Sequence, residues 1–389
     1  MQQDADILII GGGPVGATLA LALRDTGHAV TMLEAREQGA CSQDQRALAL
    51  SYGSRLILEW LGVWGELAAA ATPIETIHIS QRGSFGRSLL KAAEHNQPAL
   101  GYVLSYGALS TALNRALADM NNLRVVYGAQ ATAIDNSGDS ATVKFEHAEG
   151  TKALSASLAV VADGGRSLDD LPGLQRHDKD YGHAALVTKV ECELAHDNIA
   201  YERFTPAGPV ALLPNGKAFS LVWTATPEIA QQLCDLDEAE FLQRLHGHFG
   251  DRLGRFLSVG KRITFPLKLS YLSPVTSPRL VVIGNAAQTM HPVAGQGFNI
   301  GLRDAWELAE IVGSTAPEKI GGDAMLKNYQ QGRQVDTKGG ILFTDFLVRL
   351  FSNDIGGLSA LRAAGLGLLD LVPPAKRLLI GKMSFGAHG

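Results

Sequence analysis

The hydrophobic pattern at the start of the chain predicts a strand, a helix and a second strand. Residues 6–10, DILII, form an apolar run typical of a buried strand. The next segment, GGGPVGATLALALRDTG, has apolar residues at helical spacing between an opening Gly-Pro pair and the closing Gly27. Because AVTMLE then has the pattern of another buried strand, these segments predict a βαβ unit.

The following segments predict mainly helix between residues 51 and 122, notably Ser51 to Leu61 and Gly107 to Met120. The segment LRVVYG, residues 123–128, indicates a return to strand. Polar and apolar residues alternate over 129–148 around the turn DNSGDS, which predicts an antiparallel hairpin. LAVVADGG, residues 158–165, predicts another buried strand that ends in a turn.

From about residue 180 to 275 the pattern changes to strand-like pieces such as HAALVTKVECEL and KAFSLVWTAT, separated by Pro and Gly turns. RLVVIGN at 279–285 predicts a return to the first domain, and helix follows Gly297, with Pro373 and Pro374 dividing the last stretch into two helices. We therefore expect an α/β fold with an α+β insert: a Rossmann-like nucleotide-binding domain, an inserted mixed or antiparallel β-sheet substrate domain, and C-terminal helices. The expected boundaries are 1–75, 98–180 and 276–340 for the first domain, 76–97 and 181–275 for the second, and 341–389 for the C-terminal helical segment.

Composition excludes several functional classes. The 389 residues include 34 basic and 39 acidic side chains, and the net charge of -5 argues against nucleic acid as a partner. Three cysteines without CxxC spacing favour neither a disulfide framework nor a zinc site, and fit a reducing cytoplasm. The start MQQDAD lacks the basic region of a signal peptide, so we expect a cytoplasmic protein.

Glycines between the first strand and helix carry the first candidate chemistry. Gly11, Gly13 and Gly16 form G-x-G-x-x-G, the spacing that permits a tight turn, close approach of backbone to a pyrophosphate, and close helix–strand packing. Glu34 ends the next strand, where its carboxylate can accept hydrogen bonds from both hydroxyls of a ribose. The pattern predicts dinucleotide binding over a merely structural turn, but it does not distinguish NAD from FAD.

Two later turns extend the candidate site. Asp163 and Gly164 close the strand LAVVA at the edge where ligands bind in α/β folds, although taken alone they fit an ordinary Asp-Gly turn better. LVVIGNAAQ is followed by a helix whose start is bare of side chains at Gly295 and Gly297, so free amide groups can approach an electron-rich ring. We interpret the early glycines as holding the AMP end of an extended dinucleotide and the late ones as holding its redox ring.

With these motifs at 11–16, 163–164 and 284–301, the chain resembles the class A FAD-dependent aromatic hydroxylases, which have the para-hydroxybenzoate hydroxylase fold, over nearly its whole length. That family usually has Gly-Asp-Ala-Ala-His where this chain has GNAAQ from Gly284. The departure resembles the 2-polyprenyl-6-methoxyphenol hydroxylase branch of the ubiquinone-biosynthesis hydroxylases. Asn285 still offers an oxygen to a ribityl hydroxyl, and Asp170 stands where the family commonly has an arginine, a contact that Arg166 could replace.

The resemblance implies FAD as cofactor, with NAD(P)H as a transient co-substrate and O2 as oxidant. NAD(P)H would reduce FAD, oxygen would add at flavin C4a, and the hydroperoxide would deliver its distal oxygen to a phenol ring. No second G-x-G-x-x-G follows a later strand, so a separate NAD(P)H domain is not expected. The expected cofactor-binding residues are Gly11, Gly13, Pro14, Val15, Gly16, Glu34, Ala35, Arg46, Asp163, Gly164, Gly284, Asn285, Ala286, Pro292, Gly295, Gln296, Gly297, Phe298 and Asn299.

The expected catalytic residues are Pro292, His291 and Gln296. His291 is the candidate general base because its ordinary pKa lies near neutrality, and the alternative is a histidine that only orders its turn. His246 and His248 have a metal-like spacing but no third ligand nearby in sequence, so no metal is expected.

We expect a polyprenyl phenol as substrate, a complex with other ubiquinone-biosynthesis proteins, and a homo-oligomer. A segment near 358–372 is amphipathic and too interrupted to span a bilayer, and Lys376, Arg377 and Lys382 lie among apolar residues. These features predict peripheral contact with the inner face of the cytoplasmic membrane, or a C-terminal helix pair that covers the FAD domain. Two other classes remain open: an FAD-dependent dehydrogenase or prenyl reductase, and a non-catalytic FAD-binding subunit.

Overall fold

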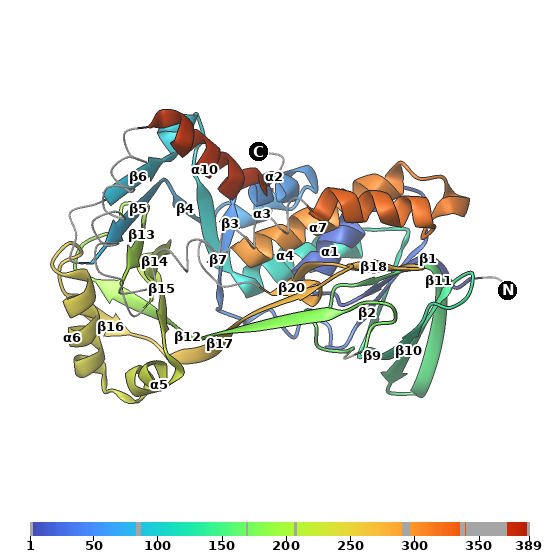
Figure 1. Ribbon diagram of the computed structural model, residues 1–389, viewed down its shortest axis with the longest axis horizontal. Helices are drawn as coiled ribbons and strands as arrows, with labels where there is room; N and C mark the ends of the chain where they lie inside the picture. Colours follow the sequence, from blue (N-terminus) through green and yellow to red (C-terminus); the bar gives the residue numbers. More distant parts are fainter. Residues whose placement is uncertain are drawn as a thin grey trace.

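The computed structural model describes residues 3–82, 87–168, 170–205, 208–289, 296–334, 339 and 372–386. Two lobes lie side by side along the long axis of the molecule, each built on its own sheet (Figure 1). The long strands β12 (Arg176–Cys192) and β17 (Ile263–Leu272) run along one side of the molecule and connect the lobes (Figure 1).

The first lobe contains an eight-stranded sheet with the central order β18-β19-β11-β1-β2-β8. From β19 to β8 the strands are parallel, and β9 and β10 form an antiparallel hairpin that extends β11. The predicted βαβ unit and hairpin are therefore confirmed. The strands are β1 (Ala5–Ile10), β2 (Val30–Glu34), β8 (Leu123–Tyr127), β9 (Gln130–Asp135), β10 (Ala141–His147), β11 (Gly150–Val161), β18 (Thr276–Ser277) and β19 (Leu280–Val282).

Both faces of this sheet are buried, which explains the unbroken apolar run in β1. Ile7 and Ile9 belong to the core formed with the helices α1 (Pro14–Ala22), α4 (Tyr106–Ala118) and α7 (Gln296–Gly313). Leu8 and Ile10 point to the other face and pack with residues of β9, β10 and β11. A parallel strand covered on both sides needs apolar residues at every position, so β1 does not alternate.

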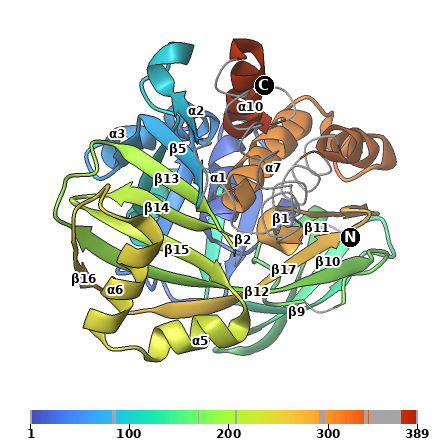
Figure 2. The same cartoon turned by 60° about the vertical axis from the view of Figure 1, so that its left-hand side comes forward.

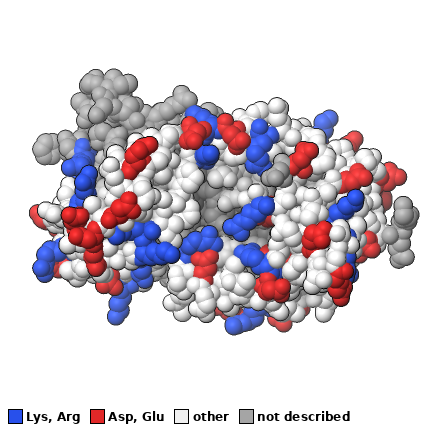
Figure 3. Space-filling view, turned by 90° about the horizontal axis from the view of Figure 1, so that it is seen from below, with Lys and Arg blue, Asp and Glu red and all other residues white. Residues whose placement is uncertain are grey.

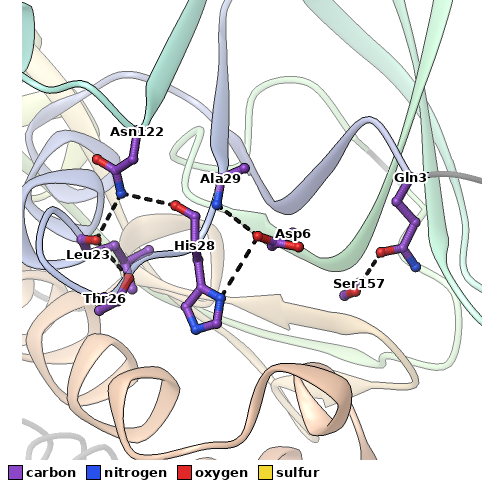
Figure 4. Close-up of polar contacts among 8 residues, drawn as sticks. All are labelled: Gln3, Asp6, Leu23, Thr26, His28, Ala29, Asn122 and Ser157. Atoms are coloured by element: carbon purple, nitrogen blue, oxygen red, sulfur yellow. Dashed lines mark hydrogen bonds and ion pairs between the residues drawn. The ribbon is translucent and has the colours of Figure 1, made fainter.

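Side-chain hydrogen bonds fix the amino-terminal ends of these strands (Figure 4). The Asn122 amide donates to the carbonyl oxygens of Leu23 and His28, and thereby joins the end of α1 to the start of β2. The Asp6 carboxylate accepts from the Ala29 N–H at 2.8 Å. Since these polar groups are paired within the protein, the opposite, carboxyl edge of the sheet is the one where a ligand is expected.

The second lobe is a nine-stranded sheet with the order β20-β17-β12-β15-β14-β13-β5-β6, in which β16 also pairs with β12. The helices α5 (Pro227–Asp235) and α6 (Glu238–Phe249) cover its outer face (Figure 2). Apolar side chains from β12, β14, β15 and α6 form a core between them. The other strands are β5 (Thr76–Gln81), β6 (Arg87–Lys91), β13 (Ile199–Phe204), β14 (Val210–Asn215), β15 (Ala218–Ala225), β16 (Phe256–Val259) and β20 (Gln288–Thr289).

A three-stranded sheet lies between the lobes, and it corrects the expectation of mainly helix between residues 51 and 122. Helices form at α2 (Tyr52–Trp60), α3 (Trp64–Leu67) and α4, but residues 72–105 consist mostly of strands. The sheet has the order β3-β7-β4, with β3 (Ala47–Ser51), β4 (Thr72–Ile74) and β7 (Gly101–Ser105), while a short 3-10 helix, η1 (Ala92–His95), follows β6. These short strands pair with distant segments, which a local pattern does not reveal.

Helix α10 (Pro373–Phe385) begins at the predicted proline break and packs near α2 and β6. Ile380 is buried with Leu90 and Leu100, and the aromatic rings of Phe385 and Tyr52 make an edge contact. A further helix covers 323–334, as expected from the pattern, and the amphipathic segment near 358–372 lies almost entirely outside the described residues. Within the described part of the chain, no helix is both long and apolar enough to cross a membrane.

Candidate functional site

The first glycine turn, between β1 and α1, touches the second predicted turn directly. Gly11 has a φ of +104°, and a Cβ added there would lie 2.6 Å from the Asp163 Cα. A Cβ at Gly16 would lie 2.0 Å from the Gly11 carbonyl oxygen. Both positions therefore require glycine, and the carboxyl ends of β1 and β11 meet there as predicted.

The start of α1 fits a phosphate. Its N-cap is Gly13, which provides no capping side chain, and Pro14 follows at the first helical position. Among the described residues, a Cβ at Gly13 would meet the Tyr106 hydroxyl at 3.6 Å and the Arg36 guanidinium at 3.9 Å. The first amide groups of α1 therefore keep the capacity to bind an anion, as the pyrophosphate of a dinucleotide requires.

Glu34 lies beside this turn, buried at the end of β2. Its carboxylate accepts the Gly12 N–H at 2.7 Å and the Arg36 Nε–H at 2.6 Å. Burial alone raises the pKa of Glu34, but the hydrogen bonds from Arg36 and Gly12 outweigh burial and leave the pKa below its ordinary value. The side chain is therefore held as a carboxylate, the form that accepts hydrogen bonds from ribose hydroxyls.

Arg46 directly precedes β3 and lies close to the same turn. It pairs with Asp44 at 2.5 Å, and its guanidinium lies over the Tyr106 ring, 4.8 Å from the centroid. Tyr106 also hydrogen-bonds to Arg36. The structure therefore places Arg46 near Gly13 through Tyr106, and its side chain is about half exposed and accessible to a ligand.

Asp163 closes its own turn, as the ordinary Asp-Gly interpretation expected. Its carboxylate accepts the N–H groups of Gly165 at 2.8 Å and Ser167 at 2.6 Å. A Cβ at Gly164 would meet no described residue within 4 Å, while one at Gly165 would lie 3.8 Å from the Ala286 Cα. The second turn is therefore rigid, open on one side, and adjacent to the late motif. Arg166 and Asp170 are both exposed.

The late motif approaches α1 from the other side. Gly284 has a φ of +63°, and added Cβ atoms at Gly284 and Gly301 would lie 3.1 and 2.9 Å from the Val15 side chain. Asn285 is exposed and Ala286 is buried. The late glycines thus allow α7 and the 284–286 turn to pack closely on α1, so the three predicted turns converge.

The remaining residues expected to bind the cofactor lie in several different environments. Gly297 lies in the first turn of α7, and among the described residues a Cβ there would meet nothing within 4 Å. The Asn299 amide oxygen accepts from the Ser51 N–H and the Ser54 hydroxyl, which ties α7 to α2. Phe298 packs against the core and Ala35 is exposed. Residues His291, Pro292 and Gly295, and the side chain of Gln296, lie outside the described residues.

Together these features fit an extended FAD. An uncapped helix start and an ionised Glu34 lie at the ends of β1 and β2, and the turns that follow β11 and β19 contact the same region. On the face shown in Figure 3, several Lys and Arg side chains lie near the centre, with Asp and Glu side chains among them. The basic groups on this face can attract an anionic ligand such as a dinucleotide.

Several residues of this site were not identified from the sequence. Arg36 and Tyr106 flank the first turn, and Asp304 binds the backbone of the late turn. Arg36 follows Glu34 by two residues, so its place next to the carboxylate at the end of the strand could have been inferred from the sequence. Tyr106 and Asp304 depend on contacts between distant segments, so no local pattern indicates them.

The histidine pair of the second lobe has other surroundings. The His248 ring packs on Trp223, with centroids 4.6 Å apart, and His246 pairs with Asp251 at 3.1 Å. Burial, followed by the charge of Arg82, lowers the pKa of His248 to about 4. Among the residues that the structure describes, no group of three His, Cys, Asp or Glu side chains has a metal-binding arrangement.

Comparison with known proteins adds independent findings. Residues 4–338 match the family described as FAD binding domain (FAD_binding_3). Ubiquinone hydroxylase UbiL of Rhodospirillum rubrum is 36% identical over 97% of this chain and 88% of its own length. The 3-demethoxyubiquinol 3-hydroxylase of Escherichia coli is 31% identical over 96% of this chain and 97% of its own length.

Solved structures show the same fold. The p-nitrophenol 4-monooxygenase PnpA of Pseudomonas putida superposes with a TM-score of 0.81 at 20% identity, covering 99% of both chains. A variant of Klebsiella pneumoniae HpxO, solved with FAD, gives a TM-score of 0.76 at 17% identity over 99% of this chain and 100% of its own. The expected Rossmann-like fold is therefore confirmed.

Proposed function

The chain belongs to the FAD-binding domain family, and from that premise we propose that it is an NAD(P)H-dependent monooxygenase that hydroxylates the ring of a polyprenylated phenol in ubiquinone biosynthesis. The observation that carries the proposal is the 36% identity, over 97% of this chain, to a ubiquinone hydroxylase. The convergence of the three glycine turns supports it, because these turns fit FAD in an extended form.

When bound, FAD supplies the redox chemistry, in which NAD(P)H provides electrons and O2 provides the transferred oxygen atom. The protein has to bind and orient FAD and the substrate, and to shield the reacting centre from water. The start of α1 would hold the pyrophosphate and Glu34 the ribose, while the start of α7 at Gly297 would direct amide groups at the ring. The second sheet would cover the substrate and exclude water from the reacting centre.

For the ring position, we propose the 2-polyprenyl-6-methoxyphenol branch, because the late motif has Asn285 and Gln288 where the wider family usually has Asp and His. The structure gives Gln288 a definite role: its side chain is 2% exposed and donates to Asp304 at 3.3 Å. The second candidate is a sister hydroxylase that acts at another ring position. The 31% identity to the Escherichia coli 3-demethoxyubiquinol 3-hydroxylase favours it.

The reaction class is tested with the purified protein, FAD, O2, and NADH or NADPH. We expect oxidation of one nicotinamide cofactor to be stimulated by a short-chain prenylphenol, with incorporation of one atom of 18O2 into the product. A dehydrogenase or prenyl reductase would oxidise or reduce the substrate without incorporating the label. A non-catalytic subunit would bind FAD and show no stimulated oxidation, and either result would contradict the proposal.

Deletion of the gene in its host tests the ring position. The proposed branch predicts accumulation of a prenylphenol that already carries the methoxy group, identified by mass spectrometry. Accumulation of a demethoxy quinol would instead assign the chain to the sister reaction. Complementation by the wild-type gene is the control.

We also propose a cytoplasmic enzyme in peripheral contact with the membrane, because a polyprenyl substrate is dissolved in lipid. Helix α10 is the candidate contact: Leu378 is 63% exposed, and Arg377 beside it is also exposed, whereas the opposite side of the helix packs on the protein. Flotation with anionic liposomes should carry the wild-type protein and less of Leu378→Asp. A lack of flotation with and without substrate would remove this part of the proposal.

A further inference from the structure

A buried ionic network lies directly behind the late turn. Asp304 of α7 is 3% exposed, and its carboxylate accepts the Gly284 N–H at 2.9 Å and the Gln288 amide at 3.3 Å. Its other oxygen lies 2.5 Å from a guanidinium nitrogen of Arg333. A single carboxylate therefore binds both ends of the segment 284–288.

Arg333 reaches Asp304 from the helix that covers 323–334. It is 3% exposed and also pairs with Glu307 at 3.0 Å, one turn after Asp304 on α7. The two helices approach closely at Gly332, where an added Cβ would lie 2.1 Å from a Glu307 carboxylate oxygen. One guanidinium is thus shared by two carboxylates, an arrangement that fixes all three side chains.

The segment held in this way is the one that leads to the expected flavin ring. Gly284 packs on Val15 of α1, so its position is linked to the first glycine turn. At the other end, Gln288 belongs to β20, which pairs with Tyr271 of β17 in the second sheet. The network therefore sets the position of a backbone segment that connects the two lobes.

We propose that Arg333 is a positioning residue for FAD: through Asp304 it holds the 284–288 turn in the geometry that the flavin requires. This role rests on the FAD binding of the family and not on the identity of the phenol. Removal of Arg333 would take the guanidinium beside Asp304 away from this buried carboxylate, which would then draw in water or rotate away from the Gly284 N–H. The turn would lose a fixed position and the flavin would bind less tightly.

The test measures FAD binding without substrate, on apoprotein reconstituted with FAD. Arg333→Met should raise the dissociation constant about 10- to 100-fold, by analogy with the loss seen when a residue that supports the ligands of a metal site is removed. Arg333→Lys, which retains the charge, should recover part of the affinity. Arg115→Met is the matched control, since Arg115 forms an exposed pair with Glu66 at 3.1 Å and should leave affinity unchanged.

Two measurements distinguish a role of Arg333 in positioning the turn from a role in the general stability of the fold. Thermal unfolding of each apoprotein reports folding, and the visible spectrum of each bound flavin reports the rigidity of the ring environment. A folded Arg333→Met protein with wild-type affinity and an unchanged flavin spectrum would overturn the inference. If Arg333→Met does not fold, Asp304→Asn provides the test, because the asparagine keeps an oxygen for the Gly284 N–H but loses the ion pair with Arg333. Wild-type FAD affinity in Asp304→Asn would equally overturn the inference.

Because no phenol is present, failure of this test would leave the proposed reaction untouched. Conversely, a failure to find hydroxylation would not alter the measured FAD affinities. The two proposals are thus tested by different observations.

Discussion

At the residue scale, the carboxylates Glu34 and Glu202 have opposite surroundings. Glu34 has Arg36 and the Gly12 N–H as partners, which keep its pKa low despite burial. Glu202 of β13 lies in register with Ile79 and Ala211, and within the described residues its carboxylate makes neither a hydrogen bond nor an ion pair. Burial raises the pKa of Glu202 to about 7.

This difference predicts that Glu202→Gln changes the stability of the folded protein in a way that depends on pH. The folded pKa of Glu202 lies above its ordinary value of 4.5, so folding is favoured while the group is protonated and loses this advantage as the pH rises through about 7. Glu202→Gln should therefore raise stability at pH 8, by about 1–3 kcal/mol, and change it little at pH 4.5. Thermal unfolding of the wild-type protein and the variant at pH 8 and pH 4.5 measures this change in stability.

Glu228→Gln is the control for this prediction, because Glu228 is exposed at the start of α5. An equal effect of Glu202→Gln at both pH values would show that Glu202 does not titrate in the expected range.

At the element scale, close approaches between helices depend on individual glycines. Gly53 of α2 faces α10, and a Cβ there would lie 2.2 Å from the Ser384 carbonyl oxygen. The Ser51 hydroxyl also donates to this oxygen at 3.2 Å. A small residue and a hydrogen bond therefore add to the Tyr52–Phe385 aromatic contact in placing α10 on α2.

Gly53→Ala should separate α10 from α2 and destabilise the protein by about 1–3 kcal/mol, as overpacking of a tight contact does. Gly65→Ala in α3 is the matched control, since a Cβ there would meet no atom within 4 Å in the part of the chain that the structure describes. Urea unfolding of both variants gives the comparison. Equal stabilities would mean that α10 does not pack on α2 in solution as described.

The elements predicted correctly from the sequence were those with local signals. β1, α1 and β2 have a continuous apolar run, a Pro at the first helical position and closely spaced glycines. In contrast, β4 to β7 were missed because each is short, and β4, β5 and β7 pair with strands distant in sequence, such as β5 with β13, while β6 pairs only with its neighbour β5. Short strands obtain their stability from such partners, which local patterns do not contain.

At the scale of the whole molecule, three turns from distant parts of the chain meet at one edge of the first sheet. Gly11 lies against Asp163, Gly165 lies near Ala286, and Gly284 packs on Val15. Each turn therefore touches the other two. A ligand that spans all three should stabilise the fold more than a ligand that reaches one.

We therefore expect FAD to raise the unfolding temperature of the apoprotein more than ADP or FMN does at equal concentration. At about 100 times its dissociation constant, FAD should add about 2.7 kcal/mol to the free energy of unfolding. Differential scanning fluorimetry measures this. Equal shifts with FAD and ADP would indicate that the late turn contributes nothing to binding.

The sequence by itself determined the βαβ unit, the two glycine-rich segments and the resemblance to flavin hydroxylases, because these depend on residues close together in the chain. It also placed Glu34 at the end of a strand beside the first turn. Only the tertiary structure decided that Arg46 reaches the first turn through Tyr106, and that Asp304 and Arg333 hold the late turn. Such partners are chosen by the packing of elements far apart in sequence, where a buried polar group must find whichever partner the fold brings to it.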